Sequence, residues 1–417
     1  MNIYGVCVLI ALLADYGLHT ASDALNLKAL NGKVPESVAS LYGPEGLDRA
    51  KRYVSAVTTD AMIERSIGLV ILFAFWLLGG FNWLDLVVRQ VTAGEVVRGL
   101  VFLGSLALGQ TLVGLPFDVH RTFVTESRFG FNRTTWQTFV ADRVKGLALM
   151  AAIGGTLLSG VLWLFMQAGD SAWLLCWLIV VAFMLVVQWL GPAVILPLFN
   201  RFDPMPNGEL RDAIVRYAES VGFPLQNVYL IDGSRRSSKA NAFFTGIGSR
   251  RRIALFDTLV NQHSTDEIVS ILAHEVGHYQ LKHVVKGLLI GALHAGVAFL
   301  LLQLFLGRPG LYDAFFLSRP SLYAGFACFL LLYTPVEMVL SVIANLVSRR
   351  HEFAADRFAV DTAPSPGTLP DALKTLSVSS LAHPNSHPFH VFLNYSHPPL
   401  AQRLDAIEER LADEVAW

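Results

Sequence analysis

Long apolar stretches separated by polar segments dominate the pattern of hydrophobic and polar positions along this chain of 417 residues. A helix needs roughly 20 apolar residues to cross the hydrocarbon core of a bilayer. Seven stretches meet this requirement, at approximately residues 3–20, 66–85, 99–117, 146–167, 172–195, 284–306 and 321–346. The pattern therefore predicts a mainly α-helical integral membrane protein with seven transmembrane helices.

The first stretch needs separate treatment because an apolar N-terminus can imitate a secretory signal peptide. No Lys or Arg precedes residues 3–19, and Asp15 interrupts the run. A convincing small-residue cleavage site does not follow it. We expect a retained first membrane helix.

Composition agrees with a membrane protein, since 53% of residues are hydrophobic and only 16% are charged. The formal net charge of −1 argues against nucleic acid as a partner. The three cysteines lie far apart within apolar runs, so they are expected to be small buried side chains rather than a disulfide framework or a zinc cluster.

Basic residues predict the orientation, because Lys and Arg are enriched in cytoplasmic loops. The loops after the first and third spans are rich in them, as are the two polar segments that follow the fifth and seventh spans. The opposite loops carry only Arg89, Arg98, Arg308 and Arg319. With the N-terminus outside, all four basic segments lie in the cytoplasm.

Four segments divide the chain. Residues 1–199 hold spans one to five, 200–283 form a small α+β unit, 284–347 hold spans six and seven, and 348–417 form a C-terminal cytoplasmic segment. Within the α+β unit we expect a helix over 209–220 and strands over 227–232, 242–245 and 252–256. Ser264 and Glu267 have the spacing of a capping box. The helix that they open meets no strong breaker before residue 306, which predicts about 60 Å of continuous helix.

That helix carries His274-Glu275-Val-Gly-His278. Residues four apart share one face of a helix, so both imidazoles can bind one zinc ion while Glu275 points at the open coordination position. Two nitrogen ligands and a carboxylate base suit zinc-assisted attack of water on an amide. The alternative is a pair of histidines with no role beyond the structure of the helix, but a His-Glu-x-x-His motif arises by chance only about once in a hundred such sequences.

A catalytic zinc site needs a third protein ligand. The best candidates follow the seventh span, where Glu352 and Asp356 are four residues apart on an expected helix. One can bind the metal while the other orients a histidine ligand. A solvated helix face with an Arg–Glu pair explains the same residues equally well.

With these residues the chain resembles a known family, the type I CAAX prenyl endopeptidases, which are seven-span zinc metalloproteases of membranes. The resemblance covers nearly the whole chain and rests on an ordered set of motifs. They are Gly114–Phe117, Glu126–Thr135, Phe139-x-x-Asp142-x-x-Lys145, Pro197–Phe202, Ser237–Gly246, Phe256–Leu259, His274–His278, Ser348-Arg-x-x-Glu352-x-x-x-Asp356 and Ser396-His-Pro-Pro-Leu400-x-x-Arg403.

The resemblance implies roles for individual residues. Glu352 matches the third zinc ligand, and Asp356 matches a partner of a ligating histidine. Asn241 and Ala242 match the strand that pairs with substrate backbone, although an ordinary strand edge has the same pattern.

The tail motif leaves alternatives open. His397 could donate to the oxyanion, and Arg403 could hold the tail or a substrate carboxylate. A structural cap formed by the His-Pro-Pro turn explains them nearly as well. Asp142 and Lys145 are expected to be structural, for instance as an ion pair.

Polar residues at membrane depth fit two arrangements. Asp15, His294 and Glu337 fall inside expected spans, where a charge facing lipid is costly. They could form a buried network between helices, or they could face the large water-filled chamber that the resemblance implies within a ring of seven helices. His263 and His283 have no ligand spacing and are expected at the surface.

Two departures from the family bear on substrate preference. Lys239 stands where relatives often have His, and Phe243 stands where they often have Tyr. The final residues carry no basic endoplasmic-reticulum retrieval signal, so a bacterial-type plasma membrane is expected at least as much as the endoplasmic reticulum.

The sequence thus predicts a zinc endopeptidase with one Zn²⁺ per chain, which cuts near the C-terminus of prenylated CAAX-type or other hydrophobic polypeptides at a membrane. One alternative is a quality-control protease with no lipid requirement. An alternative of another class is a transporter or channel with a structural zinc site, although Glu275 has no purpose there and the spans show no inverted repeat.

Overall fold

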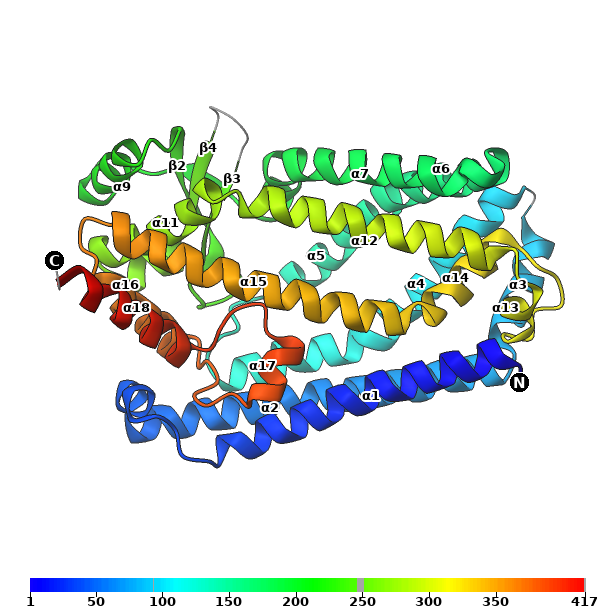
Figure 1. The fold of residues 1–417 in the computed structure, drawn as a ribbon, viewed down its shortest axis with the longest axis horizontal. Coiled ribbons are helices and arrows are strands. Elements are labelled where there is room, and N and C mark those ends of the chain that lie inside the picture. The colour runs from blue at the N-terminus through cyan, green and yellow to red at the C-terminus, as the bar shows by residue number, and fades with distance from the viewer. Residues whose placement is uncertain (93, 246–250, 416–417) are drawn as a thin grey trace.

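A computed structural model describes residues 1–92, 94–245 and 251–415 of the chain. Gly246 of the motif set and the terminal Trp417 lie outside the described residues. The fold is an elongated bundle of helices with a small sheet near one end (Figure 1). The N-terminus lies at the end opposite to the sheet and the C-terminus (Figure 1).

Within the described residues, five helical segments are long and apolar enough to cross a membrane. They are α1 (Ile3–Leu30), Glu95–Glu126 with α4 (Glu95–His120), Trp136–Gln167 with α5 (Trp136–Leu149) and α6 (Gly155–Gln167), Gly169–Phe199 with α7 (Ala172–Leu190) and α8 (Leu196–Phe199), and α12 (His283–Leu306). Their most apolar windows have a mean hydropathy between 1.5 and 2.4.

The other two expected spans are bent pairs of helices. α2 (Glu36–Leu77) and α3 (Gly80–Val91) meet at 65°, and α14 (Leu322–Leu332) and α15 (Thr334–Thr362) meet at 56°. Gly79 adopts φ +79 at the first bend, a conformation that glycine takes without strain. Pro335 occupies the first turn of α15 and cannot continue the hydrogen bonding of α14. Counting each pair as one span gives the seven that the sequence predicts.

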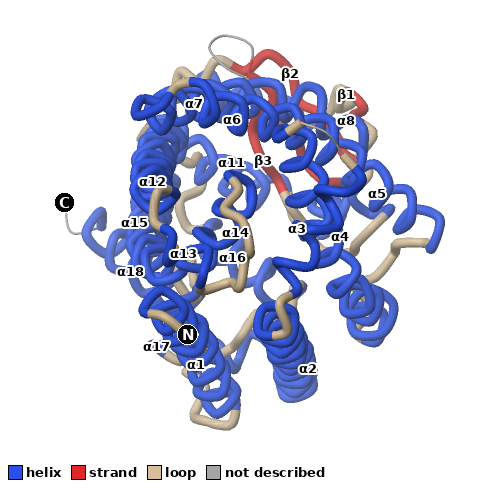
Figure 2. Tube along the Cα trace, turned by 90° about the vertical axis from the view of Figure 1, so that its right-hand side faces the viewer, coloured by secondary structure: helices blue, strands red, loops and turns tan. Residues whose placement is uncertain are grey.

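The helices are arranged in a ring when the molecule is viewed along its long axis (Figure 2). Only 6% to 22% of residues are buried in the most apolar windows of the five single helices. Helices packed on a common core would bury a whole face, so these helices are accessible on the inner as well as the outer side.

An apolar cluster fills the end of the ring near the N-terminus. Trp76 stacks on Phe315 at 5.0 Å and donates from Nε1 to the carbonyl of Ala314 at 2.9 Å. Both rings are fully buried together with Leu311 of the short helix α13 (Pro309–Asp313). This core joins helices from both halves of the chain.

Polar side chains within the spans have partners in the structure. His294 Nε2 lies 2.8 Å from Glu337 Oε2, and their side chains are 34% and 52% exposed. His19 Nε2 lies 3.6 Å from Asp15 Oδ1. A half-exposed ion pair at membrane depth is stable where it faces water rather than lipid, which favours the chamber over a fully buried network.

The α+β unit is built on a four-stranded sheet in the order β1-β2-β4-β3. β2 (Leu225–Ile231) is parallel to β4 (Arg251–Phe256), while β1 (Phe202–Pro204) and β3 (Ala242–Thr245) are antiparallel edge strands. The three expected strands are confirmed, with β2 displaced slightly toward the N-terminus. β1 was not predicted, because three residues containing a proline give no strand pattern.

Helices surround this sheet and close its core. They are α9 (Glu209–Ser220), α10 (Asp257–Gln262), α11 (Thr265–Gln280), α16 (Thr368–Ser379) and α18 (Leu400–Val415), whereas α17 (Pro388–Asn394) packs on α1 and α15. The core includes Leu255 on β4, Leu272 on α11 and Leu369 on α16, each at most 2% exposed. The C-terminal segment therefore shares one core with the α+β unit, because α16 packs on α11 and α18 packs on α15 and α16.

The predicted capping box at the start of α11 is confirmed. Ser264 Oγ accepts from the backbone N–H of Glu267 at 3.3 Å, and Glu267 Oε2 accepts from the backbone N–H of Ser264 at 2.8 Å. Replacing Ser264 with alanine removes one of these bonds. We expect the variant to lose about 1 kcal/mol of unfolding free energy, seen as a lower thermal midpoint in detergent. An unchanged midpoint would show that tertiary packing alone fixes the start of this helix.

The prediction of one continuous helix from residue 264 to 306 is wrong. α11 ends at Gln280, Lys282 adopts φ +57, and a new helix, α12, begins at His283. No helix breaker marks this site in the sequence. The break brings His283 back against α11, and the energy of that contact must outweigh the strain at Lys282.

Candidate functional site

Two helices bring the expected site residues together. α11 supplies His274, Glu275 and His278, and it packs closely along α15, which supplies Glu352 and Asp356. Gly277 permits this approach, because a Cβ there would lie 3.1 Å from the Cβ of Phe358 and 3.2 Å from the Cα of Ala355. The glycine within the motif is therefore needed for packing.

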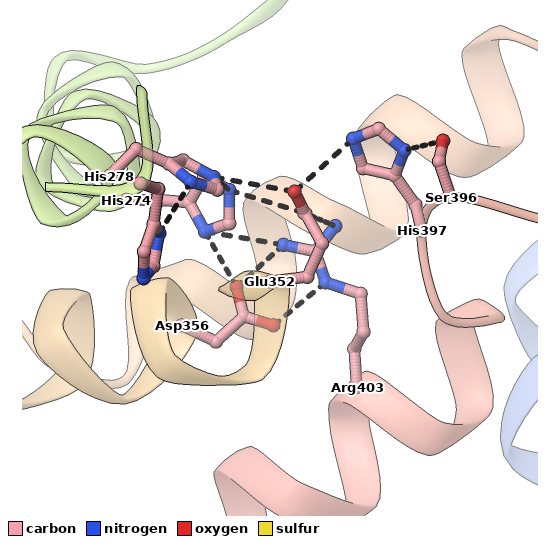
Figure 3. Close-up of polar contacts among 8 residues, drawn as sticks. His274, His278, Glu352, Asp356, Ser396, His397 and Arg403 are labelled. Atoms are coloured by element: carbon pink, nitrogen blue, oxygen red, sulfur yellow. Dashed lines mark hydrogen bonds and ion pairs between the residues drawn. The ribbon is translucent and has the colours of Figure 1, made fainter. Parts of the chain in front are cut away.

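The three candidate ligands converge on one point (Figure 3). The Nε2 atoms of His274 and His278 are 3.1 Å apart. Each lies near one oxygen of Glu352, at 3.4 Å for His274 and 3.3 Å for His278. A tetrahedral metal with ligand bonds of about 2.1 Å places its ligands about 3.4 Å apart, so the spacing fits a single ion.

Glu352 supports the same interpretation. It is 4% exposed, and its Oε2 atom is buried without a hydrogen-bond partner among the described residues. A buried carboxylate oxygen without a donor is costly. A cation held between the two imidazoles would satisfy it.

Asp356 orients the first histidine. Its Oδ1 lies 2.8 Å from His274 Nδ1, which leaves Nε2 facing the ligand cluster. Arg403 on α18 donates from Nε to Oδ2 at 2.8 Å and from Nη2 to Oδ1 at 2.5 Å. Because its guanidinium is engaged with Asp356, the geometry favours the tail-holding alternative for Arg403 over direct contact with a substrate carboxylate.

The electrostatics of the pocket attract a cation. Burial opposes the charged form of His274, but the nearby carboxylates outweigh it and raise the pKa of this imidazole to about 9. Asp356 accepts a hydrogen bond from the ring, and Glu352 Oε2 lies 3.4 Å from Nε2. A proton and a metal ion compete for the same nitrogen, so metal binding must release this proton. Burial raises the pKa of Glu275 above its ordinary value, which suits a carboxylate that accepts and returns a proton.

His397 lies beside Glu352, on the side away from His274 and His278 (Figure 3). Its Nε2 is 3.3 Å from Glu352 Oε1, and its Nδ1 is 2.9 Å from Ser396 Oγ. The side chain is 65% exposed. This residue therefore borders the site from the solvent-accessible side, where a substrate carbonyl can reach it.

The sheet presents an open edge beside α11. Among the described residues β3 pairs only with β4, and Phe256 N donates to Asn241 O at 3.0 Å. Main-chain groups alternate in direction along an antiparallel ladder, so Ala242 directs its N–H and carbonyl toward the open edge. Asn241 Oδ1 accepts from that N–H at 2.9 Å.

Lys239 joins the segment before β3 to the membrane helices. Its Nζ donates to Tyr53 Oη at 2.7 Å, lies 3.1 Å from Glu126 Oε2 and is 4.5 Å from the centre of the Phe131 ring. The backbone N–H of Ser238 donates to the carbonyl of Phe131 at 3.1 Å. The residue that departs from the family pattern thus anchors the edge strand.

Three expectations about polar residues are corrected. Asp142 does not pair with Lys145: it binds Arg236 at 2.8 and 3.0 Å, while Lys145 Nζ donates to the carbonyl of Leu198 at 2.7 Å. His263 and His283 are buried, at 8% and 7% exposed, rather than on the surface. Histidines on short links between helices carry no burial signal in the sequence, so only packing decided this.

The arrangement has the features of an integral-membrane metallopeptidase, with membrane helices, a His-Glu-x-x-His helix and a carboxylate from a second helix. Residues 24–201 match the family described as "CAAX prenyl protease N-terminal, five membrane helices", and residues 204–411 match "Peptidase family M48". The chain belongs to peptidase family M48 and is a multi-pass membrane metalloendopeptidase. This membership removes the transporter alternative.

Known CAAX prenyl proteases are similar in sequence to this chain over most of its length. It is 39% identical to "CAAX prenyl protease 1" of Saccharomyces cerevisiae, over 77% of this chain and 74% of that protein. It is 31% identical to "CAAX prenyl protease 1 homolog" of Arabidopsis thaliana, over 95% and 96%. The crystal structure of S. mikatae Ste24p matches with a TM-score of 0.91 and 31% identity, over 98% of this chain and 99% of that one.

Proposed function

We propose that this protein is a zinc-dependent endopeptidase in which His274, His278 and Glu352 hold the ion. The observation that carries the proposal is the convergence of two imidazole nitrogens and one carboxylate, whose Oε2 is buried and has no hydrogen-bond partner among the described residues. This ligand set with an open fourth position is that of catalytic zinc. A bound zinc ion would lower the pKa of water and polarise the scissile carbonyl.

In this proposal the protein side chains move the proton and fix the geometry. Glu275 accepts a proton from the attacking water and returns it to the leaving amine. Asp356 keeps His274 in the tautomer that presents Nε2 to the metal, and Arg403 holds Asp356 in place. His397 donates from its ring to the developing oxyanion.

The substrate binds as an added strand on the open edge of β3. A peptide carbonyl replaces Asn241 Oδ1 as the acceptor for the N–H of Ala242. Backbone pairing makes few demands on sequence, which suits a protease whose selectivity comes from access to an enclosed chamber.

Replacing Ala242 with proline tests this binding mode. Proline removes an N–H from the open edge rather than from the ladder, so the sheet tolerates it. One lost hydrogen bond to substrate lowers kcat/KM by about 3- to 10-fold, with zinc affinity unchanged. Ala242→Gly keeps the N–H and serves as the control. Equal kcat/KM in both variants would exclude this strand as the substrate site.

We further propose that the substrates are prenylated CAAX-type or other hydrophobic polypeptides, and that the active site faces the cytoplasm. The names of the relatives and the distribution of basic loops support these two assignments. The membrane location is a bacterial-type plasma membrane or the endoplasmic reticulum. A quality-control protease without a lipid requirement is the second candidate, favoured by the backbone-based binding mode.

One experiment distinguishes CAAX processing from quality control. The purified protein in detergent is incubated with a farnesylated CAAX-type peptide and with its unmodified twin, each with and without a zinc chelator, and the products are identified by mass spectrometry. CAAX processing predicts cleavage of the farnesylated peptide well above its twin. Equal cleavage of both would favour quality control, and cleavage that survives the chelator would remove the zinc mechanism.

A further inference from the structure

His278 has a hydrogen-bond partner that the proposed mechanism does not use. Its Nδ1 lies 2.9 Å from Nδ1 of His283, the first residue of α12. His283 is 7% exposed. The second ligating histidine is thus supported by another imidazole, whereas the first, His274, is supported by the carboxylate of Asp356.

A third histidine fixes the supporting ring. His351, the residue before Glu352 on α15, stacks on His283 with ring centroids 4.0 Å apart and an interplanar angle of 9°. Parallel stacking at this distance restricts rotation of the His283 ring. Its Nδ1 is therefore held toward His278 by contacts from α15.

The hydrogen bond has one consistent direction when His278 binds a metal through Nε2. The Nδ1 of His278 then carries the proton and donates it, and the Nδ1 of His283 accepts through its lone pair. Partners of this kind fix the ring orientation of a ligand, and their loss typically weakens metal binding by about 10- to 100-fold.

The break between α11 and α12 allows His283 to contact His278. Lys282 adopts φ +57 between the two helices, an unfavourable conformation for a lysine. A continuous helix would place His283 five residues beyond His278 and off its face. The strained turn instead brings the first residue of a membrane span against a ligand.

We propose that His283 is a positioning residue for the metal site: stacked on His351, it accepts a hydrogen bond from His278 and ties that ligand to the membrane helix α12. This inference rests on the proposed function, since it assumes that His278 binds the metal. It gives α12 a direct mechanical connection to the catalytic centre.

Zinc affinity provides the test. Apo protein in detergent is titrated with zinc against a chromogenic chelator, for the wild type, His283→Phe, His283→Gln and His351→Phe. Phenylalanine at 283 keeps a stacked ring but removes the acceptor nitrogen, so the affinity should fall about 10- to 100-fold. Glutamine offers an acceptor oxygen and should restore most of it. His351→Phe keeps the stack and should stay within about 3-fold of the wild type.

Activity separates positioning from a general folding defect. For a positioning residue, saturating zinc should recover most of the kcat of His283→Phe, and the thermal midpoint of the apo protein should match that of the wild type. Wild-type zinc affinity in His283→Phe would overturn the inference, as would equal losses in His283→Phe and His351→Phe. If the phenylalanine variant unfolds, His283→Leu against His283→Gln repeats the comparison with smaller side chains.

A His278→Ala variant distinguishes failure of the inference from failure of the proposed function. Loss of zinc binding in His278→Ala together with wild-type affinity in His283→Phe would overturn only the positioning role. Wild-type affinity in His278→Ala would overturn the proposed metal site, and the positioning role with it.

Discussion

Replacing Glu275 with alanine is expected to lower kcat by about 10³-fold while zinc content and thermal stability stay at wild-type levels. Glu275 follows a candidate ligand directly but belongs to no part of the ligand cluster itself. Burial raises the pKa of Glu275 above its ordinary value, which makes it a stronger proton acceptor than an exposed carboxylate. Removing it leaves the metal in place without a base for the attacking water.

Steady-state kinetics on a cleavable peptide, metal analysis and thermal unfolding measure the three quantities. Asp266→Ala is the matched control, because it removes an exposed carboxylate from the first turn of the same helix. Its kcat should remain within about 2-fold of the wild type, since a first-turn charge contributes only to helix stability. Full activity in Glu275→Ala would remove the proposed mechanism.

Replacing Glu352 with alanine is expected to abolish zinc binding and activity together. This carboxylate lies within 3.4 Å of both Nε2 atoms, and the proposal gives it the only charged ligand position. Its removal should weaken zinc binding by more than the roughly 100-fold that losing an outer partner causes. Adding zinc in excess should therefore recover little activity.

The control for this variant is Asp361→Ala on the same helix. Asp361 pairs with Arg410 at 2.7 Å near the surface and is not part of the ligand cluster. Its loss should lower the unfolding free energy by well under about 1 kcal/mol and leave the zinc affinity unchanged. Competition with a chelator gives the zinc affinities, and peptide cleavage gives the activity. Wild-type zinc affinity in Glu352→Ala would show that another residue completes the coordination sphere.

Local signals in the sequence predicted most of the elements correctly. Apolar length located the spans, and Ser264 with Glu267 located the start of α11, because these signals act within a few residues of one another. The helix break at Lys282 and the short strand β1 were missed. Both depend on contacts with segments far along the chain, which local pattern does not contain.

The residues of the candidate site also fall into those that local pattern predicted and those that only distant contacts brought together. Four-residue spacing on one helix placed His274 and His278 together, whereas the choice of Glu352 as their partner needed the family resemblance and then the packing of α15 on α11. Arg403, 47 residues beyond Asp356 in the chain, was predicted to hold the tail or a substrate carboxylate, and its pairing with Asp356 was not predicted. His283 was assigned to the surface, since a histidine after a turn gives no sign of burial.

The sequence by itself determined that this is a membrane protein with a hydrolytic metal motif, because apolar length and helical spacing are properties of neighbouring residues. Only the tertiary structure decided which distant side chains serve that motif: the carboxylate of Glu352, the Asp356–Arg403 pair, and His283 stacked on His351. These contacts bring together residues that are 47 to 82 positions apart in the chain. Their energy comes from burial and hydrogen bonding between helices, and such energy exists only once the chain has folded.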